Sequence, residues 1–181
     1  MPHESISVFD MFKIGVGPSS SHTLGPWRAA QRFVDSIAKK FGLDGLVSVR
    51  VLLYGSLAKT GKGHGTDIAV QLGLMGEDPV TFDVGMIGTT IEGINMKKEM
   101  RVRGSGGVGV VVRFDPEKDI EFLYEEALPY HPNAMTFLAQ WGDGRQMAET
   151  LVFDRGWICK KGGGGAAGGE CGAAAFSDRH Q

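Results

Sequence analysis

The sequence has few cysteines, no excess of basic residues and no long apolar run, and each shortage excludes a class of protein. Only Cys159 and Cys171 occur, too few for a disulfide framework or a four-thiolate metal site. The formal net charge is -2, so we expect no nucleic acid partner. The first residues, Met-Pro-His-Glu, do not resemble a signal peptide, and no apolar run reaches membrane-spanning length. We therefore expect a soluble protein in the reducing cytoplasm, without a membrane partner.

The 181 residues, 42% of them hydrophobic, suit one domain with a sizeable core. Helical and alternating patterns are mixed without strict βαβ order, which predicts the α+β class, as a single two-layer domain of mixed sheet packed with helices. The predicted helices cover 5–14, 26–41, a short stretch from about 66, and 87–99. The predicted strands cover 46–55, 108–114, 119–124 and a hairpin within 133–153 that turns at a Gly-Asp-Gly sequence.

Hydroxyl side chains precede several of these helices and suggest caps. Ser7 is expected to cap the first helix, Ser21 or Thr23 the second, and Thr66 the short helix that follows it. A capping role would account for the presence of each hydroxyl even if the residue binds no ligand.

The composition changes after Thr150. Glycine and alanine dominate the remaining residues, which leaves too little apolar side chain to offset the entropy of ordering. We therefore expect a domain over 1–150 and a glycine-rich, flexible tail over 151–181.

Three of the five histidines, His22, His64 and His131, lie in loops rich in Gly, Pro, Ser or Asn. Imidazole titrates near neutrality, with an ordinary pKa of about 6.5, and is the usual general acid or base. A single loop histidine is more often a solvated surface residue. A functional site therefore requires that the three loops converge.

Each loop also carries other polar groups. The first, GVGPSSSHTLGP, combines hydroxyls with the amides of a helix start and could bind a small carboxylate or phosphate, or could simply form a turn with a cap. The second, KTGKGHGTD, includes Lys62 and Asp67, and its alternative is a glycine-rich turn with solvated lysines. The third, YHPNAM, places Asn133 two residues after His131, a pattern typical of a turn.

Two glycine motifs do not indicate nucleotide binding. Gly55 and Gly61 are one residue too far apart for a phosphate-binding P-loop, and Gly63 stands where Ser or Thr should be. The GSGGVG segment at 104–109 fits the dinucleotide fingerprint, but a predicted strand follows it where a helix is required.

The segments SVFDMFKIGVGPSSSHTLGP, GKGHGTD and HPNAM, in this order, resemble the β domain of bacterial iron-sulfur L-serine dehydratases over roughly residues 5–150. The region is also similar to the allosteric substrate-binding domain of some phosphoglycerate dehydrogenases, an α+β fold. The resemblance implies a lyase that converts L-serine to pyruvate and ammonia in amino-acid catabolism and gluconeogenesis. It also implies a homodimer and an α domain whose cysteines hold a [4Fe-4S] cluster.

The resemblance assigns ten residues to the serine pocket. The implied catalytic residues are His22, His64 and His131, and the implied substrate-binding residues are Ser20, Ser21, Thr23, Lys62, Thr66, Asp67 and Asn133. Which histidine acts as base or acid does not follow from the sequence.

The sequence lacks the cluster cysteines that the resemblance places in an α domain or subunit. We therefore expect the isolated chain to be half of a site, inactive alone and free of cofactor. The main alternative is a regulatory module that binds serine without chemistry, and a weaker one is a folded fragment without function.

Overall fold

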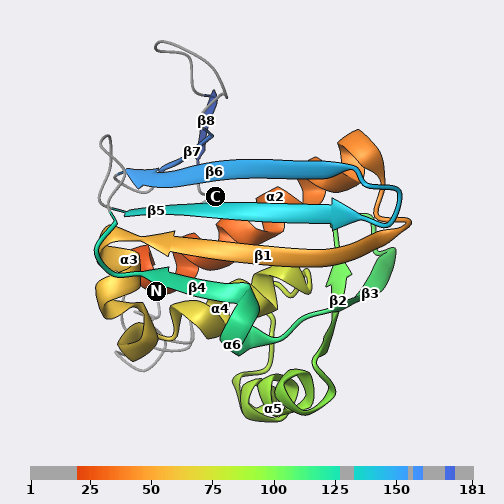
Figure 1. The fold of residues 1–181 in the computed structure, drawn as a ribbon. Helices are drawn as coiled ribbons and strands as arrows, with labels where there is room; N and C mark the ends of the chain where they lie inside the picture. Colours follow the sequence, from red (N-terminus) through yellow and green to blue (C-terminus); the bar gives the residue numbers. More distant parts are fainter. Residues whose placement is uncertain (1–19, 127–132, 155–156, 161–169, 174–181) are drawn as a thin grey trace, which may run out of the picture.

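The fold has two layers, a mixed sheet and a set of helices on one of its faces (Figure 1). The computed structural model describes residues 20–126, 133–154, 157–160 and 170–173. This arrangement confirms the predicted α+β class. The helix predicted at 5–14, with its Ser7 cap, lies outside the described residues.

The described helices are η1 (Ser20–Leu24), α2 (Gly25–Phe41), α3 (Gly55–Gly61), η2 (Lys62–His64), α4 (Thr66–Leu74), η3 (Val84–Met86), α5 (Ile87–Lys97) and α6 (Pro116–Asp119). The described strands are β1 (Leu46–Tyr54), β2 (Glu99–Arg103), β3 (Gly109–Arg113), β4 (Ile120–Leu123), β5 (Asn133–Trp141), β6 (Gln146–Asp154), β7 (Trp157–Lys160) and β8 (Glu170–Ala173). The helices predicted from 26, 66 and 87 and the hairpin of β5 and β6 are confirmed.

The sheet is built around β1. Its strand order is β2-β3-β1-β5-β6-β7-β8, and β4 pairs with β1 outside this path. One edge of β1 is antiparallel to β5, whereas the other edge is parallel to β3 near Ser48 and to β4 at residues 51–54. The sheet therefore forks along one edge of its central strand.

Helix α2 covers the middle of the sheet with the apolar face that its sequence predicts. The ring of Phe33 stacks on that of Phe137 in β5, with centroids 4.8 Å apart. The helix ends at Gly42, whose φ of +73° favours glycine and whose amide donates to the Ala38 carbonyl. The indole of Trp141 donates to the Gly42 carbonyl at 3.2 Å, which fixes the end of α2 against the end of β5.

Helix α4 lies unusually close to α2. A Cβ atom on Gly73 would be 2.3 Å from the carbonyl oxygen of Trp27 and 2.7 Å from the Ala30 Cβ. This approach is possible only because Gly73 has no side chain. It fixes the end of α4 against the first turns of α2. One histidine loop leads into α2 and the other precedes α4.

Part of the region that we expected to be a tail is strand. Strand β6 continues to Asp154, and β7 and β8 extend the sheet beyond it. The flexibility of 151–181 and the domain boundary at 150 stay predictions.

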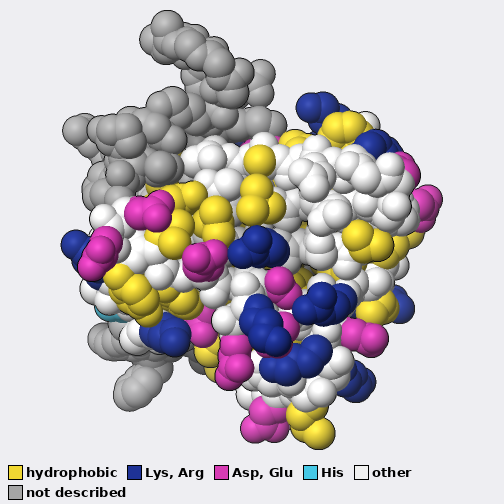
Figure 2. All heavy atoms as spheres, in the orientation of Figure 1, with side chains coloured by type: hydrophobic (Ala, Val, Ile, Leu, Met, Phe, Trp, Pro, Cys, Tyr) yellow, Lys and Arg dark blue, Asp and Glu magenta, His cyan; other side chains and the backbone are white. Residues whose placement is uncertain are grey.

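The face of the sheet opposite α2 has no helix over it among the described residues. Figure 2 shows this face, on which apolar patches alternate with charged side chains of both signs. Arg50 and Glu121 form an ion pair across it, with nitrogen and oxygen 3.3 Å apart. In the described part of the chain, no helix is long and apolar enough to cross a bilayer.

Candidate functional site

Two of the three predicted histidine loops meet beyond the end of β1. His22 comes from η1, which leads directly into α2, and His64 ends η2, which follows α3. Their ring centroids are 5.2 Å apart, with the planes tilted by 38°. His131 lies outside the described residues, so its place in the site stays a prediction.

Two buried threonines join these loops. Thr23 Oγ1 donates to the carbonyl of His64 at 3.0 Å, and Thr66 Oγ1 donates to the carbonyl of His22. Both threonines are fully buried. Each loop therefore holds the backbone of the other loop's histidine, and the distance between the two imidazoles follows from these bonds.

The same bonds correct the predicted helix caps. The residue before α2 is Leu24, which has helical dihedral angles. The residue before α4 is Gly65, which is in the left-handed region with φ of +67°. Neither helix has a side-chain cap. Because η1 continues directly into α2, no extended residue stands where Ser21 or Thr23 could cap it. The Thr66 hydroxyl donates to the carbonyl of His22 and does not cap α4.

His22 has hydrogen-bonding partners at both ring nitrogens. Ser21 Oγ lies 2.9 Å from Nδ1, and Ser56 Oγ lies 3.2 Å from Nε2. Ser56 in turn donates to Asn133 Oδ1. Ser21 and Asn133 were predicted site residues, whereas Ser56 was not, although a serine two residues after the carboxyl end of a strand is near a common position for ligand contact.

His64 has a different environment. Its Nδ1 lies 2.8 Å from the Thr60 carbonyl, and a carbonyl can only accept, so Nδ1 carries a proton. In the neutral imidazole, Nε2 then holds the lone pair. His64 is therefore suited to accept a proton through Nε2.

The electrostatics of the pair favour a neutral His22. Burial lowers the pKa of His22, and the neighbouring His64 lowers it further, whereas a hydrogen bond with the Ser56 backbone raises it without offsetting the other two. Two adjacent imidazolium ions would repel each other. His22 is therefore neutral at physiological pH.

Three other predicted binding residues lie on η2, α4 and η1, the elements that carry or adjoin the two histidines. The ammonium of the exposed Lys62 lies 5.6 Å from the ring centroid of Phe122. Asp67 is half-buried in the first turn of α4. Ser20 begins η1.

The residues present do not fit an iron-sulfur cluster. Within the described ranges, no group of three or more His, Cys, Asp or Glu side chains could hold a metal ion. The backbone register places Cys159 of β7 opposite Cys171 of β8, and these are the chain's two cysteines. A [4Fe-4S] cluster has four protein ligands, usually thiolates.

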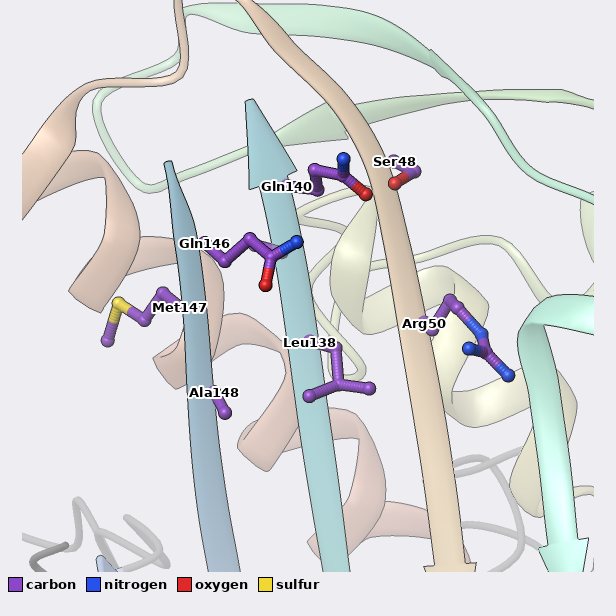
Figure 3. Close-up of a pocket in the computed structure, with 8 residues that line it drawn as sticks. Ser48, Arg50, Leu138, Gln140, Gln146, Met147 and Ala148 are labelled. Atoms are coloured by element: carbon purple, nitrogen blue, oxygen red, sulfur yellow. The ribbon is translucent and has the colours of Figure 1, made fainter. Parts of the chain in front are cut away.

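A shallow hollow on the open face of the sheet is not this site. Figure 3 shows it between β1, β5 and β6, with Ser48, Arg50, Gln140 and Gln146 among the residues that line it. It lies toward the start of β1, whereas His22 contacts Ser56, which follows the end of β1. No imidazole lines it, so we assign it no role in acid–base chemistry.

Fold and site together define a two-layer α+β domain with a pair of imidazoles at one end of its sheet. The sequence model for the serine dehydratase beta chain matches residues 7–161. The chain belongs to this family, which confirms the resemblance.

Similar proteins cover most of this chain. L-serine dehydratase of Streptomyces coelicolor is 42% identical over 152 residues, which are 84% of this chain and 32% of that protein. L-serine dehydratase of Mycobacterium bovis is 44% identical over 153 residues, with the same two shares. L-serine dehydratase 1 of Escherichia coli K12 is 42% identical over 138 residues, or 76% and 30%. The chain spans about a third of the length of these relatives.

Proposed function

We propose that this chain is the β portion of an L-serine dehydratase, which converts L-serine to pyruvate and ammonia once an α portion completes the site. The observation that carries the proposal is the pair of His22 and His64, 5.2 Å apart and held by reciprocal threonine bonds. Family membership supports L-serine as the substrate.

The chemistry of the pair suits this reaction. Elimination of water from serine requires removal of the proton on Cα and departure of the β-hydroxyl, after which the enamine hydrolyses to pyruvate and ammonia. A general base contributes to the first step when it presents a lone pair near neutral pH. In the neutral ring of His64, Nε2 has that lone pair, because Nδ1 donates its proton to the Thr60 carbonyl.

The remaining roles belong to groups around the pair. Lys62 is a cation that can pair with the serine carboxylate, and Asp67 is a carboxylate that can pair with its ammonium group. His131, two residues before Asn133 in the sequence, is proposed to join the pair. Because the two cysteines do not suit a [4Fe-4S] cluster, we propose that an α domain or subunit holds it.

Two further proposals concern the environment of the protein. The low cysteine content supports a reducing compartment, and we propose a cytoplasmic location. We also propose a homodimer, which is what the resemblance to the family implies.

A chimera tests the proposal. Residues 7–161 would replace the matching third of the Streptomyces coelicolor L-serine dehydratase, and pyruvate formation from L-serine would be measured against the intact enzyme. We expect activity, and we expect His64→Asn to lower kcat by roughly 100-fold or more, because an asparagine amide can donate to Thr60 but cannot accept a proton.

Two results would contradict this function. A folded chimera that binds serine without forming pyruvate would favour the regulatory module. Full activity in His64→Asn would remove His64 from proton transfer.

A further inference from the structure

Ser56 connects three parts of the site. It is the second residue of α3, directly after Gly55, whose φ of +56° turns the chain at the end of β1. The backbone of Gly55 pairs with that of Asn133 in an isolated bridge. The half-buried side chain of Ser56 is thereby held between η1 and the start of β5.

The hydrogen bonds of Ser56 fix a direction of donation. A serine hydroxyl has one proton, and Ser56 donates it to Asn133 Oδ1. The same oxygen can therefore only accept from His22 Nε2, 3.2 Å away, so that Nε2 must carry a proton. In the neutral ring Nδ1 then accepts from the Ser21 hydroxyl, 2.9 Å away. His22 is thus the Nε2–H tautomer.

His64 is held in the opposite tautomer, because its Nδ1 donates to the Thr60 carbonyl. The two rings are neighbours but present different groups. His22 has a proton on Nε2 and His64 has a lone pair there. The pair therefore contains one donor and one acceptor at the same ring position.

We propose that Ser56 is a positioning residue, which holds His22 as the Nε2–H tautomer, so that only one ring of the pair, that of His64, presents an unprotonated Nε2. The catalytic consequence rests on the proposed function, whereas the tautomer does not. Loss of the Ser56 hydroxyl removes the oxygen that accepts from His22 Nε2. His22 could then present a second lone pair beside His64, and the division between donor and acceptor would be lost.

Nitrogen NMR of the intact chain tests the tautomer directly. With ¹⁵N-labelled histidine, the shifts and proton couplings distinguish a protonated from an unprotonated ring nitrogen. We expect the wild-type His22 to show a proton on Nε2 and none on Nδ1 above its pKa. A proton on Nδ1 would mean that Asn133 donates to Ser56 and would overturn the proposal.

Substitutions then test the dependence on Ser56. Ser56→Ala should abolish the protected Nε2–H signal and give a mixture of tautomers, whereas Ser56→Thr, which keeps the hydroxyl, should restore the single tautomer. Ser48→Ala, on the open face of the sheet, is the matched control and should leave His22 unchanged. An unaltered His22 spectrum in a folded Ser56→Ala chain would also overturn the proposal.

Activity in the chimera tests the consequence. Ser56→Ala should lower kcat about tenfold or more with little change in KM, and should shift the pH profile of kcat, because an imidazole that is merely displaced can cost that much. Ser56→Thr should recover most of the loss. An altered tautomer with unchanged kcat would remove Ser56 from the reaction. A wild-type chimera that forms no pyruvate would contradict the proposed function instead, and the NMR result would still decide whether Ser56 sets the tautomer.

Discussion

At the scale of single residues, the site depends on two buried hydroxyls that bind backbone carbonyls. Thr23 and Thr66 were predicted as substrate ligands or helix caps, yet each donates to the carbonyl of a histidine residue on the other loop. The imidazoles are thereby placed through their own backbones. Whether either threonine also contacts serine stays a prediction.

Replacing Thr66 by Val should destabilise the chain by about 1–2 kcal/mol. Valine has nearly the same shape but cannot donate, so the buried carbonyl of His22 loses its partner. Urea unfolding measures the loss, and Thr66→Ser should recover part of it.

Thr136→Val is a matched control for this change. The Thr136 hydroxyl pairs with that of Thr150 on the open face of the sheet, and we expect a change within about 0.5 kcal/mol. Equal losses in Thr66→Val and Thr136→Val would show that the bond between the loops contributes nothing specific.

The lowered pKa of His22 predicts a pH dependence of stability. The unfolded chain binds a proton at His22 near pH 6.5, whereas the folded chain binds it only at lower pH. The contribution of His22 is therefore fully present above about pH 6.5 and is lost as the pH falls through the folded pKa. Thermal unfolding between pH 7.5 and 5.5 should show a smaller fall in Tm for His22→Asn than for the wild type.

His64 should account for part of this shift. Because His64 is one of the two causes that lower the pKa of His22, His64→Asn should raise it, and NMR titration measures the change. A His22 pKa at or above that of free histidine would contradict both expectations.

At the scale of helices and strands, the sequence predicted most elements but not their partners. The spacing of Val34 and Ile37 marks the buried face of α2, and alternation marks β5, because periodicity records which side of an element is apolar. It carries no information on which strand lies alongside. The parallel pairing of both β3 and β4 with β1 therefore could not be predicted, nor could η1, which replaces the expected cap.

The close approach of α4 to α2 gives a prediction at this scale. Gly73→Ala would place its Cβ 2.3 Å from the Trp27 carbonyl oxygen, so the helices must separate at a cost of about 1–3 kcal/mol. Thermal or urea unfolding measures it, and the ¹⁵N signals of His22 and His64 should also move, since η1 leads directly into α2 and η2 precedes α4.

Gly93→Ala in α5 is the matched control. No atom lies within 4 Å of the position that its Cβ would occupy, and alanine favours a helix over glycine by about 0.5–1 kcal/mol. We therefore expect Gly93→Ala to be neutral or stabilising. A similar loss in both variants would mean that contact between α2 and α4 is not the cause.

At the scale of the whole molecule, the site could be predicted only as a set of loops. The small and polar neighbours of His22 and His64 marked both as candidates, and the fold brings them together. Ser56 was missed because its role arises from contacts with residues 34 and 77 positions away in the chain. Local sequence does not record such contacts.

The isolated chain should neither assemble a [4Fe-4S] cluster nor form pyruvate from serine. It has two cysteines, whereas such a cluster has four protein ligands, usually thiolates. Anaerobic reconstitution followed by absorption spectroscopy measures cluster assembly. The double variant Cys159→Ser, Cys171→Ser shows how much absorption comes from adventitious iron. A stable cluster in the wild type alone, or any turnover without an α portion, would contradict the half-site account.

The fork along β1 has a consequence for the order of events during synthesis. On its antiparallel edge, Leu46 at the start of β1 pairs with Trp141, about 95 residues later. On its parallel edge, the partners of β1 are residues 113 and 120–123, which are also made later than β1. At about 5–20 residues per second, the ribosome takes roughly 5–20 s to supply the last partner. During that interval the edge of β1 that pairs with β5 lacks its full partner. A nascent chain stalled before residue 133 should therefore bind chaperones or aggregate, and one released after residue 154 should not.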